Sequence, residues 1–253
     1  MHWLPRLQAL FHGTHRVHFS STKPPFDNKA LREAVMLAVD REGIVKGLLF
    51  GKANVAYGVV PPGAWAYDAD IHPVKRDLAK AKAKLAEGGK PNGFKFEMLT
   101  QNSPVHIQFI EAVKSQLAEM GIDAELRPMA AAELSPRQAS KDLPFEAVAS
   151  AWPGRPELDE TFTLLSHSKG GQNLGRYGAS APKVDRLIEQ ARGTTDVKAR
   201  KDFYKQVQLI VNDESLDIFV YFRNDIYAMN PKVQNLIIWP DSKMRFKEVW
   251  KVK

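Results

Sequence analysis

Apolar and polar positions along the chain alternate between helical and strand spacing. Residues 27–49 predict a helix, because apolar side chains recur at helical spacing and Asp27 or Asn28 can cap its start. The same reasoning predicts further helices over residues 74–86, 105–120, 182–192 and 200–213. It predicts strands over residues 94–100, 122–128, 143–151 and 216–221, with shorter strand-like pieces at 236–239 and 248–252. The repeated order strand, helix, strand indicates an α/β sheet.

A turn rich in aromatic, glycine and proline residues follows the predicted strand 143–151. Pro153, Gly154 and Pro156 stop that strand, so Trp152 and Arg155 lie where it ends. Side chains at such a position are held by a rigid element and remain exposed, and open α/β sheets bind ligands there. Residues 59–70 form a second loop, since Pro61 and Pro62 cannot donate to a sheet ladder.

Composition is that of a globular protein with a sizeable core. Of the 253 residues, 44% are hydrophobic and 26% are charged, which fits one or two domains. No run approaches the roughly 18 consecutive apolar residues that a membrane span needs, so the chain is not expected to cross a bilayer. The sequence has 0 cysteines, which excludes cysteine nucleophiles and cysteine-type zinc sites.

The net charge of +7 raises the question of a nucleic-acid partner. The lysines gather in residues 75–90, within an alanine-rich predicted helix, where they indicate a solvated face. The sequence contains no zinc-finger or RNA-binding motif. We therefore predict no nucleic-acid partner.

Motifs for catalysis or cofactor binding are missing from the sequence. There is no nucleophile elbow, no H-E-x-x-H, no Walker loop and no Rossmann fingerprint, and the glycine-rich residues 170–175 lack the Lys-Ser/Thr of a phosphate-binding loop. An enzyme would need a different mark, such as a buried Asp–His pair or a metal. The sequence predicts no catalytic residue and no cofactor.

Histidines are the remaining candidates for a metal site. His12, His15 and His18 recur every third residue and could in principle bind a divalent ion. On an extended segment they would point in different directions, so a frayed terminal segment without metal is the favoured interpretation. Isolated histidines elsewhere are expected to be surface or capping residues; these are His72, His106 and His167.

Several segments together resemble a known family. The motifs are W-x-G-[D or R]-P-x-x-x-x-x-F at 152–162, G-x-N-x-x-x-Y at 171–177 and P-x-V-D-x-L-I-x-x-A-R at 182–192. They resemble the C-terminal half of bacterial extracellular solute-binding proteins of family 5, the peptide- and nickel-type receptors of ABC importers. Collinear agreement runs from about residue 24 to 253, through residues 24–35, 38–41, 78–94, 120–123 and 200–213.

The resemblance implies an α/β fold, a type II periplasmic-binding-protein-like lobe with a mixed sheet flanked by helices. It divides the chain into an N-terminal extension with a hinge-crossing strand (1–23), a C-terminal ligand-binding lobe (24–225) and a tail that returns to the first lobe (226–253). Family members are about twice as long, so we expect a missing N-terminal lobe or self-association. They are also periplasmic, although residues 1–21 do not form a convincing signal peptide.

The resemblance further implies capture of a small solute in an interlobe cleft, without a reaction, and delivery to an ABC permease. It implies that Trp152, Gly154 and Arg155 line the cleft. Asn173 and Tyr177 are weaker candidates, since they could instead fasten a loop, and Trp65 could form a cleft wall or fill a local core. Taken without the resemblance, Trp152 would be a core aromatic and Arg155 would pair with Glu157 or Asp159.

Arg155 departs from the pattern of dipeptide and oligopeptide binders, which carry aspartate at this position for the ligand's amino group. A guanidinium suits carboxylate or phosphate and repels an ammonium, so we expect an anionic or polar group that is not an amine. Two alternatives remain open. One is an interaction or regulatory module derived from a truncated binding protein, and the other is an α/β enzyme.

Overall fold

A six-stranded mixed sheet forms the centre of the protein in the computed structural model, which describes residues 6–71, 74–140, 145–155, 157–173, 176–238 and 244–252. Its order is β2-β6-β1-β5-β3-β4. The strands are β1 (Arg6–Phe19), β2 (Ala53–Val55), β3 (Lys95–Gln101), β4 (Asp123–Met129), β5 (Ala147–Trp152) and β6 (Asp217–Ala228).

Strand direction defines one edge of this sheet, which we call the carboxyl edge. β3 is parallel to both β4 and β5, whereas β1 is antiparallel to both β5 and β6. The carboxyl ends of β3, β4, β5 and β6 therefore lie on the same side. The segments that follow β3 and β5 both leave the sheet there.

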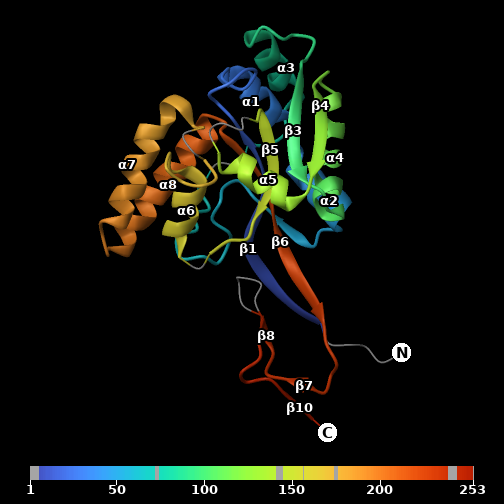
Figure 1. The fold of residues 1–253 in the computed structure, drawn as a ribbon, viewed down its shortest axis with the longest axis vertical. Coiled ribbons are helices and arrows are strands. Elements are labelled where there is room, and N and C mark those ends of the chain that lie inside the picture. The colour runs from blue at the N-terminus through green and yellow to red at the C-terminus, as the bar shows by residue number, and fades with distance from the viewer. Residues whose placement is uncertain are drawn as a thin grey trace.

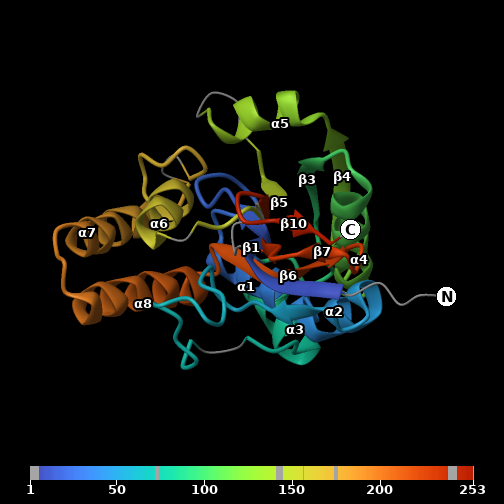
Figure 2. The ribbon, with the colours of Figure 1, turned by 90° about the horizontal axis from the view of Figure 1, so that it is seen from below.

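Helices cover both faces of the sheet (Figures 1 and 2). One face carries α1 (Lys29–Ala38), α2 (Arg41–Leu49), α3 (Leu78–Glu87) and α4 (Pro104–Ala118). The other carries α6 (Leu158–Ser166), α7 (Ala181–Arg192) and α8 (Val197–Asp213), with α5 (Ala131–Gln138) and the short 3-10 turn Gly178–Ser180 between elements. Each face has its own buried hydrophobic cluster, as expected when helices pack on both sides of one sheet.

A two-stranded ribbon extends beyond the carboxyl edge (Figure 1). It is the outer part of β1 and β6, where Arg6 pairs with Ala228 and Leu10 with Asn224. Pairing of β1 with β5 begins only at Thr14. A tail follows the ribbon and contains the short strands β7 (Val233–Gln234), β8 (Ile237–Ile238), β9 (Met244–Arg245) and β10 (Trp250–Lys251).

The predicted helix 27–49 is two helices. Asn28 caps α1 through the amide of Ala30, as its position predicts, but the chain is extended at Val39. Asp40 then caps α2 by accepting from the amide of Gly43 at 2.8 Å. A side chain that caps a new helix competes with continuation of the old one, which explains the break.

Most of the other predicted elements agree with the structure to within a few residues, whereas β2, α5 and α6 were not predicted. The helices predicted at 105–120, 182–192 and 200–213 correspond to α4, α7 and α8, and the helix predicted at 74–86 begins only at Leu78. The segment from residue 12 to residue 18, interpreted as frayed, lies within the strand β1 inside the sheet, so that interpretation is wrong. The predictions at 143, 144 and 239 fall outside the described residues. No helix among the described residues is long and apolar enough to cross a membrane.

Candidate functional site

The carboxyl edge gathers most of the predicted contact residues. The turn from β5 into α6 carries Trp152, Gly154 and Arg155, and Asn102 and Ser103 lead from the neighbouring strand β3 into α4. Gly154 has a φ of 61°, a left-handed conformation that favours glycine, so this residue sets the shape of the turn. In open α/β sheets the crevice beyond the carboxyl ends of the strands is where ligands bind.

Trp152 is mostly buried, with an exposed fraction of 8%. Its indole N–H donates to the hydroxyl oxygen of Thr161 at 3.2 Å, and its ring belongs to the cluster under α6, α7 and α8. The guanidinium of Arg155 lies 5.3 Å from the centre of this ring. The tryptophan thus supports the turn from below and fixes the aromatic base on which Arg155 rests.

Arg155 reaches solvent, since 37% of its side chain is exposed. Its Nε pairs with Glu160 Oε1 at 3.1 Å, and its Nη1 donates to the carbonyl of Gly154 at 3.1 Å. The prediction that Arg155 pairs with Glu157 or Asp159 is wrong. Glu157 pairs with Arg200 and Asp159 with Arg192, because both acids lie on the side of α6 that faces these helices.

Asn173 and Tyr177 lie behind the surface. The Asn173 amide donates to the carbonyl of Ser166, while its buried Oδ1 has no hydrogen-bond partner among the residues that the structure describes. The hydroxyl of Tyr177 donates to Asp217. Both side chains therefore hold the loop that precedes α7, and their role as ligand contacts stays a prediction.

Trp65 lies on the proline-rich loop and is 36% exposed. It is the outer ring of a row formed with Tyr204 and Phe162. Its ring packs edge-on against Tyr204, at 6.0 Å between centres, and Tyr204 stacks on Phe162 at 4.3 Å. The guanidinium of Arg200 lies 5.0 Å from the Trp65 ring. The structure does not bring Trp65 into contact with Arg155.

A buried network of ionisable groups joins β1 to β6. Asp217 Oδ1 accepts from Arg16 Nη1 at 2.7 Å and lies 3.2 Å from His18 Nδ1, and all three residues are almost fully buried. Burial acts to raise the pKa of Asp217, but Arg16, His18 and Tyr177 together lower it. Burial lowers the pKa of His18, so its ring is neutral.

This network contains a buried Asp–His pair, the feature named above as the mark of an enzyme. The carboxylate and the imidazole are both 0% exposed, so a substrate does not reach them. The two oxygens of Asp217 are also occupied by Arg16 and Tyr177. The pair therefore connects structural elements, and it offers no acid–base site to a ligand.

A second polar group lies at the carboxyl edge on the opposite face from Trp152, and the sequence analysis missed it. His15 of β1 stacks on Tyr221 of β6, with ring centres 4.3 Å apart, and lies 5.8 Å from His106 in the first turn of α4. Burial, then the charges of His106 and Arg223, lowers the pKa of His15 to about 3. The histidine spacing in the sequence drew attention to His15, but it did not identify the neighbours of His15, because Tyr221 and His106 are far from it in sequence.

The other histidines singled out in the sequence either make local contacts or lie outside the described residues. His106 Nδ1 lies 2.7 Å from the hydroxyl of Ser103, and His167 Nδ1 accepts from the amide of Lys169, so both act locally near helix ends as expected. His72 and the side chain of His12 lie outside the described residues. Among the described residues, no three histidine, aspartate or glutamate side chains gather to hold a metal ion.

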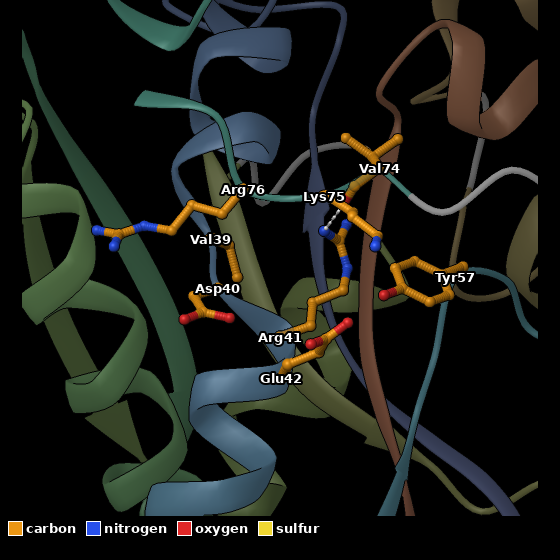
Figure 3. Close-up of a pocket in the computed structure, with 8 residues that line it drawn as sticks. All are labelled: Val39, Asp40, Arg41, Glu42, Tyr57, Val74, Lys75 and Arg76. Carbon is orange, nitrogen blue, oxygen red and sulfur yellow. Dashed lines mark hydrogen bonds between the residues drawn. The ribbon is translucent and has the colours of Figure 1, made fainter. Parts of the chain in front are cut away.

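A small cavity of about 200 Å³ lies where α1 meets α2 (Figure 3). Arg41 is buried there, donating from Nε to the carbonyl of Phe219 at 2.7 Å and from Nη1 to that of Val74 at 2.8 Å. Burial lowers the pKa of Arg41 to about 10. Its guanidinium ties three segments together, and the wall also contains the charged side chains of Asp40, Glu42, Lys75 and Arg76.

Solved structures define the class of protein to which this fold belongs. The oligopeptide-binding protein AppA from Bacillus subtilis, in complex with a nonapeptide, superposes with a TM-score of 0.85 at 22% identity, over 99% of this chain and 53% of that chain. HbpA2 from Haemophilus parasuis gives a TM-score of 0.83 at 24% identity, over 99% of this chain and 50% of that chain. The fold is that of type II periplasmic binding proteins, of which this chain covers about half.

Sequence similarity identifies the family within this class of fold. Residues 9–173 match bacterial extracellular solute-binding proteins, family 5, middle region, and the chain belongs to this family. Heme-binding protein A of Haemophilus influenzae is 28% identical over 88% of this chain and 42% of its own length. The probable D,D-dipeptide-binding periplasmic protein DdpA of Escherichia coli is 28% identical over 88% of this chain and 43% of its own length. The chain thus spans less than half the length of these relatives, which belong to a family of binding proteins and not of enzymes.

Proposed function

We propose that this chain is the C-terminal lobe of a periplasmic solute receptor that serves an ABC importer. The observation that carries the proposal is the carboxyl edge, where the Trp152–Arg155 turn stands beside the base of the β1–β6 ribbon. A ribbon that leaves the sheet at the ligand-binding edge is suited to connect a second lobe that closes over the solute. The permease is the partner that receives the solute.

Arg155 supplies the proposed selectivity. It is the exposed cation of the turn, held over Trp152, and its guanidinium suits a carboxylate or another polar group that is not an amine. In this structure the Arg155 guanidinium forms an ion pair with Glu160. Because a surface ion pair contributes only about 0.2–1 kcal/mol, an incoming oxyanion can replace Glu160 at small cost.

Reversal of the charge at Arg155 tests this proposal. Calorimetric or NMR titration with acidic and basic dipeptide-like solutes should show that the wild-type chain prefers anionic solutes, weakly because it supplies one lobe. Arg155→Asp should weaken anion binding by about 10- to 150-fold, as expected for loss of a charge-assisted hydrogen bond. Arg192→Asp makes the same charge change on α7, where Arg192 pairs with Asp159, and should leave binding unchanged.

Removal of the competing carboxylate gives the opposite result. Glu160→Gln should strengthen anion binding by about 1.4- to fivefold, the free energy of a surface ion pair. Equal affinity for anionic and cationic solutes in all three proteins, namely wild type, Arg155→Asp and Glu160→Gln, would refute the assignment.

A second function is favoured by the tail. Exposed apolar side chains gather beyond the ribbon, at Ile237, Phe246, Trp250 and Val252. Such a surface fits coverage by the first lobe or by a second copy of the chain. Sedimentation analysis distinguishes the two: a stable dimer that binds no solute would support an interaction module, whereas a monomer supports the receptor lobe.

A further inference from the structure

A cavity of about 180 Å³ lies between the loop 56–71, α8 and the strands β2 and β6, and we call it the β2 cavity. Tyr67 is 38% exposed and lies at its mouth, whereas Phe222 is 2% exposed and lies at its floor. Most of the wall is apolar or aromatic, through Val55, Tyr57, Val60 and Ile71 as well. An apolar cavity of about 150 Å³ holds benzene, so the β2 cavity is large enough for one aromatic ring that enters from outside.

Phe50, which follows the last residue of α2, is an aromatic side chain that the lobe leaves uncovered. It is 84% exposed, more than any other large hydrophobic side chain among the described residues. Its backbone is left-handed, with a φ of 50°, a conformation that side-chain-bearing residues disfavour. Neither the exposure nor the backbone conformation stabilises the lobe, as we expect of a residue that contacts a partner.

Charges beside Phe50 and beside the β2 cavity are of opposite sign. Lys46 lies in the last turn of α2 and Lys52 follows Phe50 by two residues, and neither forms an ion pair within the described part of the chain. Asp70 adjoins the cavity wall, is 85% exposed, and lies 3.7 Å from its one cationic neighbour, Lys205. Its carboxylate is therefore open to a lysine from outside, so the surroundings of the ring and of the cavity are complementary.

The ring and the β2 cavity lie at opposite ends of the same edge strand. β2 is the last strand of the sheet, and among the described strands it pairs with β6 alone. Phe50 comes four residues before the exposed Asn54, the middle residue of β2, and Gly58 in the cavity wall comes four residues after it. A twofold axis at Asn54 therefore sets the ring of each copy against the cavity of the other, which is an isologous contact.

We infer that two copies of this chain dimerise across β2, with Phe50 of each copy inserted in the β2 cavity of the other. Lys46 or Lys52 then faces Asp70 of the second copy. Two rings and a few charges make a small interface, so the dimer is reversible and forms at high protein concentration. The interface includes neither the Arg155 turn nor the tail, so the dimer binds solute as the monomer does, and the inference is independent of the proposed function.

Sedimentation equilibrium at protein concentrations up to about 1 mM, the range of weak association, tests the inference. Wild type should pass from monomer to dimer as its concentration rises. Phe50→Ser removes both inserted rings and should weaken the dimer by at least about 100-fold. Phe246→Ser makes the same change in a phenylalanine of the tail that is 64% exposed, and it should leave the dimer unchanged.

Two outcomes of this comparison would overturn the inference. One is a dimer that Phe246→Ser abolishes and Phe50→Ser retains, which would assign the association to the tail. The other is a wild-type chain that stays monomeric at every concentration. Loss of solute binding in a dimer that Phe50→Ser dissociates would instead count against the proposed function alone.

A mixture of two variants tests whether the ring enters the cavity. Ala69→Trp adds a large side chain at an exposed position of the cavity wall, so it should obstruct the β2 cavity and weaken the dimer as Phe50→Ser does. The mixture of the two variants retains one ring and one open cavity that match, so it should form a heterodimer only about tenfold weaker than the wild-type dimer. A folding defect in either variant does not produce this gain. A mixture that associates no better than the separate variants would overturn the inference.

Discussion

His15→Phe separates the cost of the His15 ring nitrogens from the value of its packing. Phenylalanine keeps the stack on Tyr221, now 4.3 Å between ring centres, and the edge contact with Phe109 at 5.6 Å. It removes two buried nitrogens that have no partner in the described part of the chain, and each such nitrogen costs about 1–3 kcal/mol. The slightly larger ring offsets part of this gain through overpacking. We therefore expect the variant to be at least as stable as wild type at pH 7.

The pH dependence isolates the nitrogens from the packing. The pKa of His15 is about 3 in the folded protein and 6.5 in the unfolded chain. At a pH between these two values the unfolded chain therefore binds a proton at this residue and the folded protein does not. Wild type then loses about 1.4 kcal/mol per pH unit below 6.5 from this group alone, or about 2.7 kcal/mol by pH 4.5. His15→Phe lacks this loss.

Urea unfolding at pH 7, 6.5, 5.5 and 4.5 measures both quantities. The stability difference between His15→Phe and wild type should widen steadily below pH 6.5. The loss that arises from His18, whose pKa burial also lowers, is common to both proteins and cancels in the comparison. A constant difference across this range would refute the reasoning, because His15 would then be able to take a proton while folded. A large loss of stability at pH 7 would show that its nitrogens have partners.

Five further substitutions test three other parts of the structure. Asp217→Ala leaves Arg16 buried without its carboxylate and should lower the free energy of unfolding in urea by about 3–5 kcal/mol. Tyr177→Phe removes one hydrogen bond to that carboxylate and should lower it by about 1.5–3 kcal/mol. A larger loss for Tyr177→Phe than for Asp217→Ala would contradict the network. Gly154→Ala forces alanine to a φ of 61° and should cost about 1–2 kcal/mol by calorimetry, while Gly171→Ala, in open space, should have almost no effect. Asp40→Ala removes the cap of α2 and should lower stability by about 1 kcal/mol, and an unchanged melting temperature would disprove the capping role.

Local signals predicted the parts of the fold that local physics determines. Helical spacing located α4, α7 and α8, and the stop at Pro153 located the end of β5. The break at Asp40 was not predicted, because the apolar pattern is similar whether the helix continues or Asp40 caps a new helix by accepting from the amide of Gly43. The sequence analysis also missed α5, whose Pro136 is unfavourable inside a helix.

The candidate site was predictable as a place but not as a set of contacts. The turn with Trp152 and Arg155 follows from the end of a strand, yet the pairing of Arg155 with Glu160 depends on how α6 rotates against α7 and α8. His15 and His106 meet only because β1 lies inside the sheet, between β6 and β5. Such contacts between distant segments leave no local pattern in the sequence.

The central claim is that a solute binds at the carboxyl edge of this lobe. Mapping backbone amide shifts during titration with a panel of acidic dipeptide-like solutes and diacids tests it most directly. The account predicts that the largest changes fall in the turn after β5 and at the start of α4, around Arg155 and His106. Changes centred on the Arg41 cavity, or no changes with any solute, would contradict it.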